Sequence, residues 1–351
     1  MNRFNLWGCE GKKRCYTENN CWLCRKGDAE MGRRRTQGTT PDTKNSTVSW
    51  GRRIARKKYK YLLLLPSFIC LFIFAYIPMA GIYIAFADYK LGQGIFEAKF
   101  VGLDHFVKFF KDASGVSMRV FRNTIGINLF SLMLGMLFPC TFALFLNEVR
   151  STRFKRFIQT VTFFPFFLSP VVIYALAYNF FSSNSGLLNR ILTNMGLIKS
   201  NINFLGDSKW SWPLIIFLNL WKGFGYNSVV YIAAITGISQ EQYDSAKIDG
   251  AGRFACMRHI TLPNIMPTVV VLLILSVGSI VGGDFNMMYM FTNQLNRDSM
   301  EVFSTYVYRM GLQKLRFSFA TAASLVLSII SLSLTLGANA ISRKVNNHAI
   351  F

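Results

Sequence analysis

The residues of this chain that suit metal, nucleotide or acyl chemistry are few and widely spaced. Its N-terminal segment holds four of the seven cysteines, Cys9, Cys15, Cys21 and Cys24. Their thiolates could bind zinc, but a single C-x2-C pair without a nearby histidine is also what a metal-free basic tail would show. The sequence contains no G-x4-G-K-[ST] phosphate loop and no G-x-S-x-G elbow, and its three histidines are far apart. We therefore expect no catalytic residue, no metal site and no cofactor in this chain.

Residues 239–267 are the stretch whose pattern best suits an interaction. Ser239 and Gln242 could form a capping box that opens a short helix, and Asp249-Gly250 is a turn signal. Leu262-Pro263 then leads into an apolar run. A helix, a turn of small residues and a second helix suit docking into a cleft on another protein. A solvated connecting loop is the alternative.

Six long apolar runs must position this loop. The chain has 351 residues, of which 52% are hydrophobic and only 16% charged, whereas soluble domains are about 25% charged. A helix needs about 20 apolar residues to cross a bilayer. The sequence therefore predicts an all-α integral membrane protein. Its six transmembrane helices are expected at about 61–87, 123–147, 157–181, 211–238, 262–290 and 317–342.

Basic residues indicate the orientation of these helices. The chain carries 39 Lys and Arg against 17 Asp and Glu. Many of them precede the first run, and four stand in the short second loop: Arg150, Arg153, Lys155 and Arg156. The positive-inside rule then predicts that both termini are cytoplasmic. The expected parts are a flexible basic segment at 1–58, a six-helix domain at 59–345 with a cytoplasmic loop at 239–263, and a short tail at 346–351.

The loop also resembles a known family motif. Permease subunits of binding-protein-dependent ABC importers carry E-A-A, three residues, Gly, nine residues and I-x-L-P between two membrane helices. Here Asp244-Ser245-Ala246 is followed by Gly250 and then by Ile260-Thr261-Leu262-Pro263, with every spacing matched. Asp replaces Glu and Ser replaces the first Ala. The loop is therefore similar to the segment with which these permeases contact their ATPase.

The resemblance extends from about residue 55 to the C-terminus. Several segments look like the carbohydrate-uptake branch of these permeases, and within it like the LplB-like polysaccharide permeases. They are 100–103 (FVGL), 146–150 (LNEVR), 154–159 (FKRFIQ), 221–225 (WKGFG), 230–237 (VYIAAITG) and 305–311 (TYVYRMG).

The resemblance implies a type I importer (MetI-like) fold in a bacterial plasma membrane. The chain would be a membrane-spanning subunit of an ATP-driven importer and not an enzyme, because a separate cytoplasmic ATPase dimer would bind ATP and Mg. A second homologous permease would complete a heterodimer, and a lipid-anchored or periplasmic binding protein would deliver an oligosaccharide or polysaccharide fragment. The ATPase-coupling residues implied are Glu241, Tyr243, Asp244, Ser245, Ala246, Asp249, Gly250, Ala251, Ile260, Leu262 and Pro263.

Polar residues within the apolar runs are candidates for the sugar path. A charge in the membrane costs about 3 kcal/mol on insertion scales and usually faces a cavity or a partner. Lys222 stands near the middle of its run, which favours a cavity or a pairing over exposure to lipid. Asp284 stands late in its run and could equally be an interfacial residue. Sugars need hydroxyl partners and flat aromatic faces, and the candidates are Trp221, Lys222, Tyr226, Asp284, Asn286 and Asn293.

Three other functions compete with this interpretation. An ion-gradient-driven secondary transporter or a channel would often show internal repeats and midplane ionisable groups, and this sequence shows no obvious repeat. A membrane enzyme would need a catalytic cluster. A nucleic-acid binder is suggested only by the basic tail, which membrane lipids with anionic headgroups explain more economically.

Overall fold

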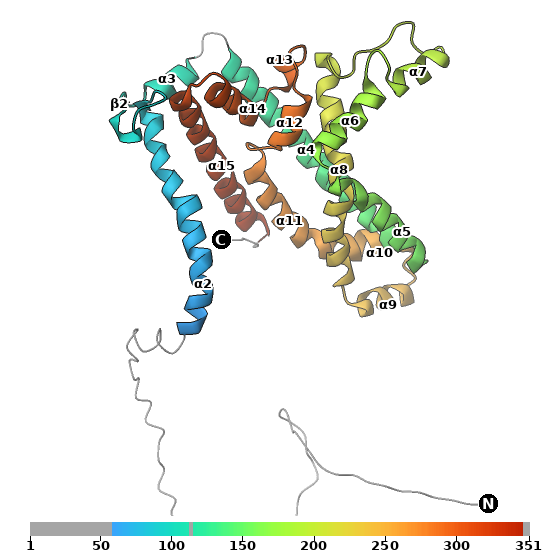
Figure 1. Cartoon of the computed structure of the whole chain (residues 1–351). Helices are drawn as coiled ribbons and strands as arrows, with labels where there is room; N and C mark the ends of the chain where they lie inside the picture. Colours follow the sequence, from blue (N-terminus) through green and yellow to red (C-terminus); the bar gives the residue numbers. More distant parts are fainter. Residues whose placement is uncertain (1–57, 112–114, 347–351) are drawn as a thin grey trace, which may run out of the picture. The chain divides into compact units, whose positions relative to one another are not determined.

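The computed structural model describes residues 58–111 and 115–346, and these residues are mainly helical (Figure 1). The described residues from Pro66 onward form one compact unit. The α-helices are α2 (Lys58–Leu71), α3 (Asp104–Phe110), α4 (Val116–Asn147), α5 (Thr152–Phe163), α6 (Pro170–Phe181), α7 (Leu187–Asn194), α8 (Ser208–Thr236), α9 (Gln240–Ile248), α10 (Arg253–Cys256), α11 (Leu262–Ser279), α12 (Phe285–Phe291), α13 (Arg297–Met300), α14 (Phe303–Tyr308) and α15 (Phe317–Asn346). A short antiparallel pair joins β1 (Ala87–Asp88) to β2 (Lys99–Phe100), with Ala87 opposite Phe100.

Several α-helices continue into tighter or wider turns. Helix α2 is followed by a π segment (Phe72–Tyr76) and a 3-10 segment (Ile77–Phe86). A π segment (Met257–Thr261) joins α10 to α11, so that Arg253–Ser279 is a single helix of 27 residues. A 3-10 turn at Phe164–Phe167 continues α5, and a π turn at Arg309–Gln313 continues α14. A separate 3-10 turn at Ile95–Glu97 lies between β1 and β2.

At least four helices are long and apolar enough to cross a membrane. They are Tyr59–Phe86, Val116–Asn147, Arg253–Ser279 and Phe317–Arg343. Helix α8 has 29 residues, or about 43 Å of rise, which is also enough to span. It falls short of the other four in apolar character because Asn219, Lys222 and Asn227 interrupt it.

Two of the predicted helices are broken. The prediction of one helix over 157–181 is wrong, because α5 with its 3-10 turn meets α6 at an angle of 101°. Pro165 and Pro170 flank this bend, and proline has no N–H with which to continue the helical hydrogen bonds. The prediction of one helix over 262–290 is also wrong. Helix α11 ends at Ser279, Gly283 has a φ of +59°, and Asp284 caps the separate helix α12.

The core lies where α4 and α8 pack along each other and α6 and α12 close around them. Its fully buried side chains include Ile127, Ile173, Ile215 and Met287. Helix α5 approaches α8 as closely as backbone allows, because a Cβ on Gly225 would lie 2.2 Å from the carbonyl oxygen of Thr162. Only glycine fits at this crossing.

The end of α4, the start of α5, helices α9 and α10 and the start of α11 gather at one end of this unit, whereas α7 and α13 lie at the other (Figure 1). The four N-terminal cysteines, for which zinc binding was the alternative, and most of the basic N-terminal segment lie outside the described residues. Within 58–111 and 115–346, no group of three or more His, Cys, Asp or Glu could hold a metal.

Candidate functional site

Helix α9 ends in a turn that its sequence specifies. Gly250 has a φ of +82°. Its N–H donates to the Lys247 carbonyl over 3.1 Å, and the N–H of Ala251 donates to the Ala246 carbonyl over 2.8 Å. This is the Schellman arrangement, which requires the left-handed conformation that glycine adopts most readily. The Asp249-Gly250 turn therefore directs the chain back toward α10.

Two hydrogen bonds fasten α9 to the helix that follows it. The hydroxyls of Tyr243 and Thr261 lie 2.9 Å apart, and the amide of Asn264 donates to Gln242 Oε1 over 3.0 Å. Ser239 caps α9 by accepting from the N–H of Glu241. The predicted capping box is not formed, because the Gln242 side chain binds Asn264 instead. The docking loop and the start of α11 are thus joined by side chains as well as by the chain itself.

The opposite face of α9 is open to solvent. Glu241, Asp244 and Ser245 are exposed, and Ile248 is 88% exposed. The Lys247 ammonium donates to the Asp244 carboxylate over 2.9 Å, so this hydrogen bond lowers the pKa of Asp244 and raises that of Lys247; Gln240 lowers the Asp244 pKa further. An exposed apolar side chain among acidic residues is suited to a protein contact.

The other predicted loop residues support this face or lie at its edge. Ala246, Ala251, Ile260 and Leu262 are half-buried. Asp249 and Pro263 are exposed. Phe254, which our sequence analysis did not select, is 69% exposed on α10. Its signal in the sequence was a large aromatic residue shortly after the Asp249-Gly250 turn.

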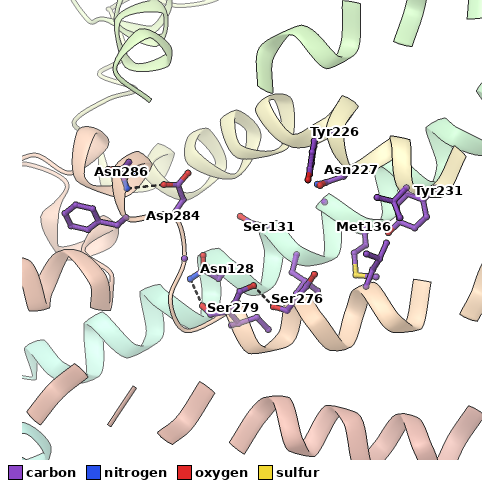
Figure 2. Close-up of a pocket in the computed structure, with 17 residues that line it drawn as sticks. Asn128, Ser131, Met136, Tyr226, Asn227, Tyr231, Ser276, Ser279, Asp284 and Asn286 are labelled. Atoms are coloured by element: carbon purple, nitrogen blue, oxygen red, sulfur yellow. Dashed lines mark hydrogen bonds between the residues drawn. The ribbon is translucent and has the colours of Figure 1, made fainter. Parts of the chain in front are cut away.

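A cavity of about 780 Å³ lies between α4, α8, α11 and the start of α12 (Figure 2). Most of its polar groups are amides and hydroxyls, which can both donate and accept hydrogen bonds. The polar lining residues are Asn128, Ser131, Tyr226, Asn227, Tyr231, Ser276, Ser279, Asp284 and Asn286. The cavity therefore offers hydrogen-bond partners at a depth where the surrounding helices are apolar.

The two charges predicted for this region face each other. Lys222 Nζ on α8 lies 3.8 Å from Asp284 Oδ2. The other carboxylate oxygen of Asp284 accepts from the N–H groups of Asn286 and Met287, at 3.0 and 3.2 Å, and so caps α12. Asp284 lines the cavity, and Lys222 reaches it as the counter-ion of Asp284.

Tyr226 presents an aromatic face beside the cavity. Its ring stacks on Phe166, with centroids 4.2 Å apart and planes 5° apart, and it is 48% exposed. Trp221 instead lines a separate apolar pocket of about 310 Å³ with Phe217 and Phe224. Asn293 lies apart from both, where its amide donates to the Leu205 carbonyl over 2.8 Å and its oxygen accepts from Leu295 and Asn296. The structure thus brings Tyr226, Asp284 and Asn286 together at the cavity, but not Trp221 or Asn293.

Several lining residues were missed in the sequence. Ser276 and Ser279 lie three positions apart on α11, and Asn128 and Asn227 interrupt the apolar runs of α4 and α8. Asn128 also donates to the Ile280 carbonyl over 2.6 Å, where α11 has ended. Polar residues within apolar runs were the available signal, and we applied it only to charges and their neighbours.

Comparisons with known proteins match this architecture. The family model of the binding-protein-dependent transport system inner membrane component matches residues 135–347. Protein LplB of Bacillus subtilis is 38% identical over 309 residues, which are 88% of this chain and 96% of LplB. The polygalacturonan/rhamnogalacturonan transport system permease protein YteP of the same organism is 38% identical over 301 residues, 85% of this chain and 92% of YteP.

Solved structures give the same result. A crystal structure of a bacterial ABC transporter involved in the import of the acidic polysaccharide alginate contains a chain that is 35% identical, with a TM-score of 0.77, over 84% of this chain and 99% of that one. The alginate transporter in complex with an alginate pentasaccharide-bound periplasmic protein matches with a TM-score of 0.78 over 86% and 99%. These matches confirm the resemblance and the all-helical permease fold. The chain belongs to the family of binding-protein-dependent transport system inner membrane components, and it is a multi-pass membrane permease subunit rather than an enzyme.

Proposed function

We propose that this chain forms one half of the translocation path of an ATP-driven importer for oligosaccharides or polysaccharide fragments. The observation that carries the proposal is the cavity of about 780 Å³, whose wall combines amides and hydroxyls with the stacked ring of Tyr226. Sugars present hydroxyl groups and flat apolar ring faces, so they match both kinds of wall. The polygalacturonan/rhamnogalacturonan permease YteP and the alginate importer support a carbohydrate substrate.

The topology that we propose has six spans with both termini in the cytoplasm of a bacterium. Helix α8 would be the fourth span and the bent α5–α6 pair the third. The end of the unit that holds α9 would then be cytoplasmic, in agreement with the basic residues of the second loop. A second permease would supply the other wall of the path.

We further propose that α9 is the coupling helix and docks on an ATPase dimer that binds ATP and Mg. Ile248 would enter a groove, and Glu241, Asp244 and Asp249 would contact its rim. The single helix Arg253–Ser279 is about 40 Å long. It begins at the docking loop and ends at the cavity wall, so a displacement of α9 reaches the site where the sugar is held. A solute-binding protein on the other side of the membrane would deliver the sugar to the outward-facing state.

The proposal is tested by reconstitution. The chain is co-expressed with a second permease and an ATPase, purified and placed in proteoliposomes. The expected result is ATP-dependent uptake of labelled oligosaccharide in the presence of the binding protein. Uptake that needs no ATP and collapses when an ionophore dissipates the ion gradient would instead assign a secondary transporter.

A further inference from the structure

Helix α5 presents basic and apolar side chains on one exposed face. Arg153 and Arg156 are exposed in its first turns. Phe157, Val161 and Phe164, which follow on the same side of the helix, are 65%, 53% and 63% exposed. The spacing of these residues places them on one helical face, with the charges toward its N-terminal end.

The other face of α5 is fixed against the protein. The backbone at Thr162, nine positions after Arg153 and therefore on the opposite side of the helix, meets α8 at Gly225. This contact determines which side of α5 faces outward. The packing of α5 on α8 therefore keeps the basic and apolar side chains on the outer surface of the protein.

The basic end of α5 has no acidic partner in the described part of the chain. None of its four cations forms an ion pair there: Arg150, Arg153, Lys155 and Arg156. Arg153 and Arg156 are three positions apart, so their Cβ atoms lie about 5–6 Å from each other and can bracket one phosphate. The positive end of the helix dipole adds to the same field.

The dimensions of this face fit one leaflet of a bilayer. From Arg153 to Phe164 the chain rises about 16 Å, which is close to half of the roughly 30 Å hydrocarbon core. A phosphate at the arginines would therefore place its acyl chains along Phe157, Val161 and Phe164. We propose that this face of α5 binds an anionic phospholipid of the cytoplasmic leaflet, with the headgroup phosphate held between Arg153 and Arg156. The assignment to that leaflet rests on the orientation given under the proposed function.

The test measures lipid binding directly. The full-length chain and its co-expressed partner subunits are purified in nanodiscs of phosphatidylcholine with increasing phosphatidylglycerol, and native mass spectrometry counts the phosphatidylglycerol that stays bound. Arg153→Gln/Arg156→Gln should lower phosphatidylglycerol affinity about 25-fold, because each basic residue near an anionic surface contributes about fivefold. Arg153→Lys/Arg156→Lys should keep most of the affinity.

The matched control is Arg190→Gln/Lys199→Gln, which removes the same charge from exposed positions in and after α7 at the other end of the unit (Figure 1). It should leave phosphatidylglycerol binding unchanged. Equal retention by the wild type and the α5 Gln variant would overturn the proposal. So would loss of a partner subunit from that variant at every lipid composition, because the face would then be a protein contact. Mass spectrometry counts bound lipid without any transport step. A wild type that binds phosphatidylglycerol but lacks ATP-driven uptake would therefore contradict the proposed function and not the lipid site.

Discussion

Neutralising Asp284 alone should impair the protein more than removing the Lys222–Asp284 pair as a whole. The two charged atoms are 3.8 Å apart, for which Coulomb's law gives about 4 kcal/mol at an effective dielectric constant of about 20. The Asp284 side chain is 41% exposed, so solvent screening reduces the attraction to roughly 1–2 kcal/mol. Asp284→Asn removes this attraction and leaves Lys222, which is 20% exposed, without its counter-ion.

An unpaired cation at that depth is the larger penalty, up to about 3 kcal/mol. Lys222→Gln/Asp284→Asn removes the cation as well, so the double variant should be more stable than Asp284→Asn. The Asn side chain can still accept a hydrogen bond and cap α12. Asp284→Ala should lose about 1 kcal/mol more than Asp284→Asn, because α12 then has no cap.

The assay is a double-mutant cycle on free energies of unfolding, measured for all variants in one detergent–lipid mixture. The same variants are then compared for oligosaccharide uptake in proteoliposomes. We expect a coupling energy of roughly 1–2 kcal/mol between Lys222 and Asp284. If the two single changes add within about 0.3–0.5 kcal/mol, the two side chains do not interact and the reasoning is refuted.

Three further results are expected. Gly250→Ala should destabilise the α9 turn by about 1 kcal/mol and Gly250→Asn by less, because a Cβ has open space there but the φ of +82° is unfavourable for alanine. Gly250→Trp should uncouple ATP hydrolysis from uptake while the protein still inserts. Full uptake by the Gly250→Trp variant would contradict the coupling role. The Asp244–Lys247 pair should contribute constant stability between about pH 5 and pH 9. The pKa of Asp244 is lowered from 3.8, so the contribution of the pair disappears at low pH only as the pH falls through that lower value. The pKa of Lys247 is raised from 10.5, so the contribution disappears at high pH only above 10.5. A stability difference between the wild type and Asp244→Asn that varied within this window would argue against the pair. Gly225→Ala should cost about 1–3 kcal/mol of unfolding free energy through overpacking against Thr162. Gly135→Ala on α4, where a Cβ meets nothing within 4 Å, should instead be neutral or stabilise by up to about 1 kcal/mol through helix propensity. Equal melting temperatures of the two variants would show that α5 can move away from α8.

The sequence predicted the class of protein and the docking loop better than the cavity. Apolar runs and basic loops act locally, so they can be recognised from the chain alone. The Gly250 turn is also local, because its hydrogen bonds join residues five or fewer positions apart. The role of these loop residues in contacting an ATPase stays a prediction.

The cavity depends on contacts between distant segments, which spacing does not reveal. Lys222 and Asp284 were selected as separate charges, and only the packing of α8 against the start of α12 makes them a pair. Asn293 has the same polar character but lies in a loop that holds the Leu205 carbonyl. The bend between α5 and α6 was missed because a proline-containing apolar run is compatible with both a kinked and a continuous span.

The break between α11 and α12 bears on hydration. From Ile280 to Asp284 the backbone is not helical, and lipid cannot satisfy the carbonyl and amide groups of such a segment. Asn128 satisfies one of these groups, the Ile280 carbonyl, and the segment borders the cavity. Irregular backbone at membrane depth is tolerated where it lines a water-filled space. On the proposed translocation path, the break therefore marks how far water enters this subunit. A sugar that reaches this point would exchange hydrogen bonds with water for hydrogen bonds with the cavity wall.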